Sequence, residues 1–189
     1  SGYEEISQLL DNIEVSDFIS SRNRAIVEII YGGGLRLNEL VSLNLTSLDL
    51  PTVTFHVGSL ERLRRVPIGK RAAAAVKEYL LFRADLLIDK PIVDIDVGAF
   101  FLNTVGKRLH RRTVQRVVAR FLDEVDVSIG PQNLRRFCAT HMIEGGASVE
   151  GVAKLFGQKT IELAFHESTE AELVNRLRSS YAASHPRSK

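Results

Sequence analysis

The chain has 189 residues, of which 44% are hydrophobic and 25% are charged, a composition typical of one soluble globular domain. Its single cysteine, Cys138, excludes an intrachain disulfide and a cysteine metal cluster, and no apolar run is long enough to cross a bilayer. The formal net charge of +2 is too small to indicate a nucleic-acid partner by itself. We therefore expect one domain over residues 1–189 of a cytoplasmic protein without membrane attachment.

The first forty residues follow the hydrophobic period of helices. Helices are expected at residues 3–12, from a cap at Ser20 or Ser21 to residue 31, and at residues 35–40. Glycines at positions 32–34 end the second helix, because glycine adopts positive φ at little cost. The short third helix carries Arg36 and Glu39 on one face, where Glu39 can orient the guanidinium and leave donors free for an anion.

The middle of the chain changes to β structure. Residues 53–57 alternate between apolar and polar side chains, which predicts a strand that pairs with residues 64–68 in a hairpin. Pro67 lacks an N–H group and therefore indicates an edge strand. The other elements expected here are an alanine-rich helix at residues 70–83 and a short buried strand or extended piece at residues 100–102. Residues 84–98 have no assignable pattern.

The last part is again helical. The expected helices cover residues 113–125, a stretch that begins at Pro131 and ends before Gly145, residues 149–156 after a Ser148 cap, and residues 170–181. The helix that begins at Pro131 carries Arg135 and Arg136 in its first turn, where free backbone N–H groups favour an anion. The fold class predicted from all these segments is mainly α with a small β-hairpin or sheet (α+β).

Basic residues gather in two segments. Residues 106–120 contain six lysines and arginines and no acid, and residues 59–70 contain four against one glutamate. Such clustering is the electrostatic footprint of a protein that binds a phosphate backbone. The candidate DNA-contacting residues are Arg62, Arg64, Arg65, Lys107, Arg108, Arg111, Arg112 and Arg116.

Four segments in order resemble the catalytic domain of Xer-type tyrosine recombinases, in the phage integrase superfamily. Gly-Gly-Leu-Arg-Leu-Asn-Glu-Leu at 33–40 resembles the first arginine box, and Leu-Arg-Arg-Phe-Cys-Ala-Thr-His at 134–141 resembles the second. Val-Pro-Ile-Gly at 66–69 resembles the end of the β-hairpin, and Tyr-Ala-Ala-Ser-His-Pro-Arg at 181–187 resembles the Xer tail. The resemblance implies a double-stranded DNA partner, no metal and no organic cofactor. It also implies that the N-terminal core-binding domain usual in the family is absent from this chain.

In the chemistry that the resemblance implies, a tyrosine attacks a DNA phosphodiester while two arginines hold the non-bridging oxygens. Arg36 and Arg135 match those arginines, and Glu39 matches the acid that orients the first. The lysine, the two histidines and the nucleophile are replaced; their positions fall on Ser59, Gln132, Gln158 and Glu167. Glutamine can donate a hydrogen bond but cannot transfer a proton, and a carboxylate repels phosphate. We therefore expect a DNA-binding homologue that cannot cleave DNA.

Two alternatives stay open. An active recombinase with displaced catalytic residues would need another nucleophile, and Tyr181 is a better candidate than Tyr31 or Tyr79, which face the core of predicted helices. Tyr181 lies 23 positions after Gln158, beyond the short spacing of the family. The second alternative is a regulatory partner of an active recombinase, since the apolar stripe in residues 170–189 could dock on another copy or on a different recombinase.

Overall fold

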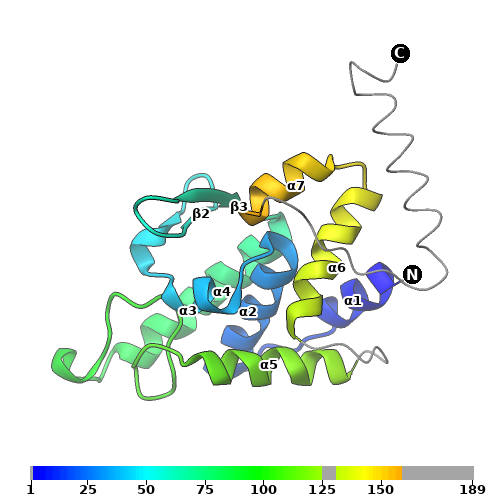
Figure 1. The fold of residues 1–189 in the computed structure, drawn as a ribbon. Helices are drawn as coiled ribbons and strands as arrows, with labels where there is room; N and C mark the ends of the chain where they lie inside the picture. The colour runs from blue at the N-terminus through cyan, green and yellow to red at the C-terminus, as the bar shows by residue number, and fades with distance from the viewer. Residues whose placement is uncertain (1, 125–130, 159–189) are drawn as a thin grey trace, which may run out of the picture.

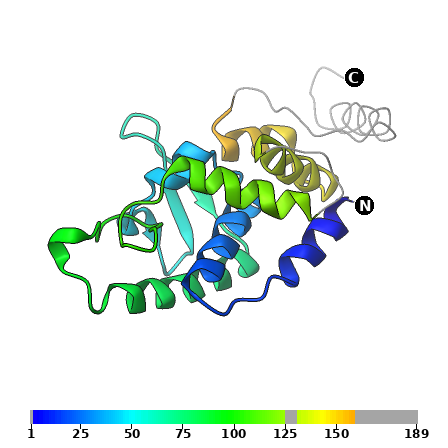
Figure 2. The same ribbon diagram turned by 90° about the horizontal axis from the view of Figure 1, so that it is seen from below.

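Helix α2 (Phe18–Gly33) is the central element of the computed structural model, which describes residues 2–124 and 131–158 (Figure 1). Nine of its 16 residues are buried, so apolar side chains leave it in several directions rather than along one stripe. The helices packed around it are α1 (Gly2–Asp11), α3 (Leu37–Ser42), α4 (Lys70–Leu87), α5 (Arg111–Asp123) and α6 (Pro131–Glu144). Helix α5 lies at the lower end of this bundle in Figure 1 and nearest the viewer in Figure 2.

The start of α2 differs from the prediction. Its cap is Asp17, whose side chain accepts a hydrogen bond from the Ser20 backbone at 2.7 Å, while the Ser20 hydroxyl accepts one from the Asp17 backbone at 3.0 Å. Ser20 is therefore the third residue of a capping box rather than the cap, and the helix begins earlier than expected. The predicted end is confirmed, because Gly34 closes the helix with φ of 64°.

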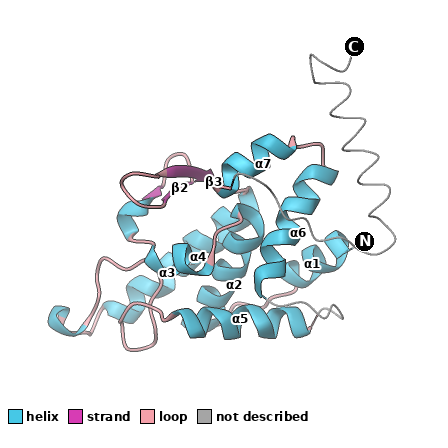
Figure 3. Ribbon diagram, in the orientation of Figure 1, coloured by secondary structure: helices cyan, strands magenta, loops and turns pink. Residues whose placement is uncertain are grey.

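The predicted hairpin is confirmed and belongs to a three-stranded antiparallel sheet, shown in magenta in Figure 3. The strands, in spatial order, are β1 (Leu48–Asp49), β2 (Thr54–Val57) and β3 (Arg64–Pro67). Phe55 of β2 pairs with Val66 of β3, and both side chains are fully buried. Strand β3 is an edge strand, as Pro67 indicated, and it lies beside α7 (Val149–Phe156). Strand β1 is too short for a two-residue period to reveal it.

Residues 84–98 had no assignable pattern in the sequence. Their first part continues α4 to Leu87, and a short 3-10 helix, η2 (Ile92–Asp94), follows. A second such turn, η1 (Leu45–Ser47), precedes the sheet. The predicted piece at residues 100–102 is buried and makes one isolated bridge, between Leu102 and Arg108, instead of a strand ladder. The Tyr79 hydroxyl satisfies backbone groups of this piece, because it donates to Phe100 O at 2.9 Å and accepts from Leu102 N at 3.1 Å.

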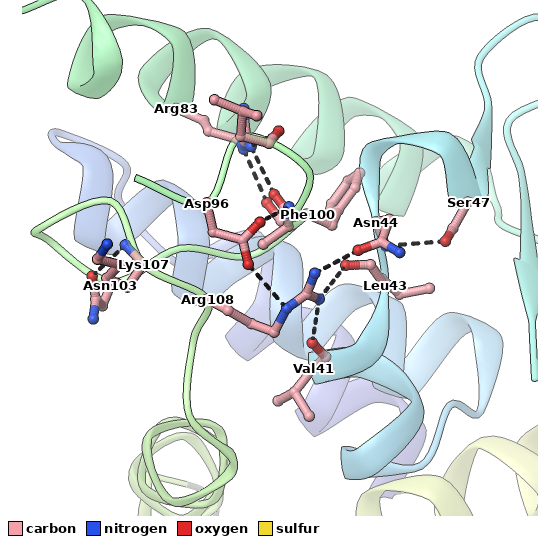
Figure 4. Close-up of polar contacts among 12 residues, drawn as sticks. Val41, Leu43, Asn44, Ser47, Arg83, Asp96, Phe100, Asn103, Lys107 and Arg108 are labelled. Carbon is pink, nitrogen blue, oxygen red and sulfur yellow. Dashed lines mark hydrogen bonds and ion pairs between the residues drawn. The ribbon is translucent and has the colours of Figure 1, made fainter. Parts of the chain in front are cut away.

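Two arginines hold the loops of this region by binding backbone carbonyls (Figure 4). Arg83 is 6% exposed, and its guanidinium donates to Ala99 O at 2.7 Å, Val97 O at 3.0 Å and Phe100 O at 3.2 Å. A buried guanidinium here replaces the sheet hydrogen bonds that an irregular segment lacks.

Arg108, a predicted DNA contact, also joins the loops of the fold (Figure 4). Its Nη1 donates to Val41 O and Leu43 O at 2.9 Å each, its Nη2 donates to the Asn44 side chain, and its Nε lies 3.3 Å from Asp96 Oδ2. Every nitrogen of the guanidinium is therefore engaged within the fold, and contact of Arg108 with DNA stays a prediction.

The two helices described after residue 130 confirm the prediction for this part. Helix α6 spans Pro131–Glu144, and α7 is capped by Ser148, whose side chain accepts from Gly151 N at 3.1 Å. Gly157 ends α7 with φ of 62°. The helix predicted at residues 170–181 lies outside the described residues. Among the described helices, none has the length and apolar character that crossing a membrane requires.

Candidate functional site

Four arginines line one pocket of about 320 Å³ in the described structure. The pocket lies where the end of α2, the start of α3, the first turns of α5 and α6, and the end of α7 meet. Its polar lining residues are Arg36, Asn38, Arg111, Arg135, Arg136 and Gln158. No carboxylate is among its lining residues in the described part of the chain. The cationic groups face one cavity without an acid in its wall, which is the arrangement that binds an anion.

Arg135 is fixed by the C-terminal carbonyls of two helices. Its Nε donates to Gly34 O at the end of α2, and its Nη2 donates to Phe156 O at the end of α7 at 2.8 Å. Such carbonyls carry partial negative charge, and the guanidinium also stacks 4.8 Å above the Phe156 ring. No hydrogen bond to a described residue uses Nη1 of Arg135, which leaves that nitrogen for a ligand in the pocket.

The close packing at this point depends on Gly34. A Cβ atom there would lie 2.3 Å from the Phe156 ring, and the residue has positive φ. Burial lowers the pKa of Arg135 to about 10, and the nearby Arg36 charge acts in the same direction. The guanidinium is still charged at neutral pH, and a bound anion would relieve the repulsion between the two arginines.

Glu39 lies closer to Arg64 than to Arg36, the arginine expected from the sequence. The carboxylate forms a bidentate pair with Arg64, with Nη1–Oε1 at 2.6 Å and Nη2–Oε2 at 2.8 Å. It also accepts the Arg36 backbone N–H at 2.8 Å, whereas the Arg36 guanidinium lies 3.7 Å away. The prediction that Glu39 orients the Arg36 guanidinium stays a prediction: the two side chains form a long ion pair, while the shorter contacts of the carboxylate go to Arg64. Arg36 is the N-cap of α3, so the carboxylate one turn later meets its backbone first.

These contacts determine the protonation state of the Glu39 carboxyl group. Burial alone would raise the pKa of the carboxyl, but hydrogen bonds from Arg64 and from the Arg36 N–H outweigh burial and lower it. The group is therefore ionised at neutral pH. The Arg36 side chain is 48% exposed, and within the described part of the chain the long ion pair is what holds it, so its guanidinium can bind a ligand.

The structure brings together some of the predicted site residues. Arg36, Arg135, Gln158 and Arg111 all line the pocket. Arg136, expected with Arg135 at a helix start that favours an anion, also lines the pocket. The backbone carbonyls of Gly34 and Phe156 were missed, because no side-chain pattern reveals an acceptor that depends on where helices end.

Other predicted positions lie elsewhere. Ser59 is exposed in the hairpin turn and lines a separate shallow cavity, together with His56 and Glu39. Gln132 belongs to the first turn of α6, but its side chain is outside the description, as are Glu167 and Tyr181. Neither described tyrosine side chain lines the pocket: Tyr79 is fully buried, and the Tyr31 hydroxyl lies 2.7 Å from His141 Nδ1.

The remaining candidate DNA-contacting residues are on the surface. Arg62 and Arg65 are exposed on the hairpin, and Lys107 is exposed on the turn before α5. Arg112 and Arg116 line a shallow groove on the exposed side of α5. Their contact with DNA stays a prediction. Within the described residues, no group of three or more His, Cys, Asp or Glu side chains is placed to hold a metal ion.

Comparison with known proteins agrees with this architecture. The sequence profile of the phage integrase family matches residues 3–166. The tyrosine recombinase XerC of Pelotomaculum thermopropionicum is 32% identical over 189 residues, which cover 98% of this chain and 61% of that relative. The chain thus spans about three fifths of the length of this curated relative.

Two solved structures show the same fold. The crystal structure of XerA recombinase superposes with a TM-score of 0.72 at 22% identity, covering 97% of this chain and 64% of that one. The XerH site-specific recombinase bound to palindromic difH substrate, a post-cleavage complex, gives a TM-score of 0.71 at 22% identity, covering 91% of this chain and 50% of that one. The profile match and the shared fold together show that this chain belongs to the phage integrase family and has the catalytic-domain fold of tyrosine recombinases.

Proposed function

We propose that this chain binds double-stranded DNA by its phosphate backbone and does not cleave it. The observation that carries the proposal is the pocket in which Arg36 and Arg135 converge with Arg111 and Arg136. A phosphate between Arg36 and Arg135 would satisfy donors that no described residue uses and would offset the repulsion between the two cations. The XerH structure, which contains a difH substrate, supports DNA as the source of that phosphate.

The residue types at the positions matched to the family's catalytic residues support the proposed lack of cleavage. A general acid or base contributes about 10²–10⁴-fold to a rate, and Gln158 in the pocket wall cannot transfer a proton. The loss of a nucleophile has a larger consequence, because it removes the covalent route itself. Neither Tyr31 nor Tyr79 lines the pocket, and Glu167 stands where the family's tyrosine is expected.

A covalent trap tests both parts of this proposal. The chain is incubated with a pool of nicked duplexes whose sequence is randomised around the nick, so that a cleaved end diffuses away and any protein–DNA link persists. We expect a salt-sensitive complex on native gels and no DNA-linked protein after denaturation. Arg135→Gln is the matched variant for the binding measurement, because it removes one of the two arginines that are proposed to hold the phosphate.

Each result has one interpretation. A DNA-linked band would contradict the absence of cleavage, and its loss in Tyr181→Phe would establish an active recombinase with a displaced nucleophile. A wild-type chain that leaves the duplex pool unshifted at low salt would contradict DNA binding itself and favour a role in protein–protein interaction.

A further inference from the structure

Arg64 connects three elements that meet beside the phosphate pocket, although it does not line the pocket. It comes from β3 and pairs with Glu39 of α3, and its Nε donates to Leu155 O in the last turn of α7 at 2.9 Å. Its side chain is only 15% exposed. All three guanidinium nitrogens are engaged, so Arg64 has a poor geometry for binding DNA phosphate directly.

The pair with Arg64 controls what Glu39 does to Arg36. The Glu39 carboxylate already lies 3.7 Å from the Arg36 guanidinium, and its own side chain is 14% exposed. A half-buried carboxylate that lost its bidentate partner would turn to the nearest remaining cation, because an unpaired buried charge is costly. Arg36 is that cation, and its charge would then be neutralised by the protein instead of by a ligand.

The same guanidinium also fixes the end of α7. Leu155 O binds Arg64 and the next carbonyl, Phe156 O, binds Arg135, so β3 and α6 hold consecutive groups of one helical turn. The chain then passes through Gly157, where a Cβ would lie 3.3 Å from Arg64 Cδ, to Gln158 in the pocket wall. Arg64 thus influences two sides of the pocket.

We propose that Arg64 is a positioning residue that holds the Glu39 carboxylate at a long 3.7 Å distance from the Arg36 guanidinium, so that the two do not close into a direct hydrogen-bonded pair and Arg36 stays available for DNA phosphate. This inference rests on the proposed function and adds to it. It reassigns Arg64, which the sequence placed among the DNA contacts, to a role that acts through Glu39 and Arg36.

A double-mutant cycle tests the inference, with a fluorescently labelled random-sequence duplex as the probe. Arg64→Gln is measured in the wild-type and in the Glu39→Gln background at one salt concentration. We expect about a tenfold loss of affinity in the wild-type background, the size of one lost charged hydrogen-bond contact, and little loss when Glu39 carries no charge. Lys77→Gln, which removes an exposed charge on α4, is the control.

Equal losses in both backgrounds would overturn the inference, since a direct phosphate ligand or a purely structural residue would act whether or not Glu39 is charged. Arg64→Gln in the Arg36→Gln background gives a second reading, with little further loss expected. Thermal melting checks folding, and if Arg64→Gln does not fold, Arg64→Lys replaces it, because lysine keeps the charge without the bidentate pair. A wild-type chain that fails to bind the duplex would instead contradict the proposed function.

Discussion

Two regions of this molecule use arginine on backbone carbonyls and differ in what they leave unsatisfied. Around Arg108, every guanidinium nitrogen is engaged by the loops that it joins. Around Arg135, two nitrogens bind helix-end carbonyls while the third has no acceptor among the described residues and the side chain lines a cavity. The first arrangement stabilises the fold. The second also presents charge to a ligand.

The difference shows that charge in the sequence does not determine the role of an arginine. Arg108 and Arg111 belong to the same basic run, yet only Arg111 lines the pocket. What separates them is the presence of backbone acceptors within reach, which depends on where α3 ends and where α5 begins. Each of the following predictions tests one side of this comparison, from the largest expected effect to the smallest.

Replacing Arg135 by Gln affects both roles at once. Gly34 O and Phe156 O lose a charged donor, and the pocket loses a phosphate ligand. Hydrogen bonds to charged groups contribute about 1.5–3 kcal/mol, so duplex affinity is expected to fall on the order of 10–100-fold and the melting temperature to fall by several degrees. Fluorescence anisotropy and thermal melting measure the two effects. Wild-type affinity in this variant would exclude Arg135 from DNA binding.

Replacing Arg108 by Gln separates stability from binding. Val41 O and Leu43 O lose a charged donor, although Phe100 N still donates to Leu43 O at 2.9 Å, and the pocket is untouched. We expect the free energy of unfolding to fall by about 1–3 kcal/mol, with duplex affinity of the folded protein unchanged within about twofold. Urea unfolding and anisotropy at one salt concentration test this. If the variant instead keeps wild-type stability and its duplex affinity depends less on salt, Arg108 contacts DNA rather than stabilising the fold.

His141 gives a third case, a half-buried group that can carry charge. Burial lowers the pKa of His141 from 6.5 to about 4, and its Nδ1 lies 2.7 Å from the Tyr31 hydroxyl. The unfolded chain therefore binds a proton that the folded chain excludes between these pH values, and stability falls as the pH drops from 6.5 towards 4.

We expect His141→Gln to remove a loss on the order of 1 kcal/mol over this range, after allowance for partial solvent exposure. The free energy of unfolding of variant and wild type, compared at several pH values, isolates the histidine from the acids that titrate nearby. Parallel pH profiles for the two proteins would show that His141 is protonated equally in both states.

Arg112 on α5 tests the exposed arginines. It lines a shallow groove and is largely solvated, so Arg112→Gln should leave the free energy of unfolding within about 0.5 kcal/mol of wild type. If it contacts DNA, the slope of log affinity against log salt should decrease in magnitude by about 0.9. An unchanged slope would place this side of α5 away from the duplex.

The sequence predicted the helices with strong periodicity, the β2–β3 hairpin and the glycine that ends α2. Those features depend on local patterns that one chain displays directly. The start of α2 was misplaced because Asp17 and Ser20 are both good caps, and only the reciprocal hydrogen bonds decide between them.

The site was predictable in its residues and less so in its contacts. Arg36, Arg135 and Gln158 were expected together and line one pocket. The partner of Glu39 was not predictable, because Arg64 is 25 positions away and reaches Glu39 only after the β2–β3 hairpin packs against α3 and α7. Long-range pairs of this kind depend on tertiary packing and leave no spacing in the sequence.

The most direct test of DNA binding at this pocket is the salt dependence of duplex binding in Arg36→Gln. The Arg36 side chain is 48% exposed, and among the described residues its guanidinium makes a 3.7 Å ion pair with Glu39, so its removal should leave the melting temperature unchanged. If Arg36 neutralises a DNA phosphate, the slope of log affinity against log salt decreases in magnitude by about 0.9 relative to wild type. A slope equal to that of wild type, in a folded variant, would contradict the claim that this pocket holds the DNA backbone.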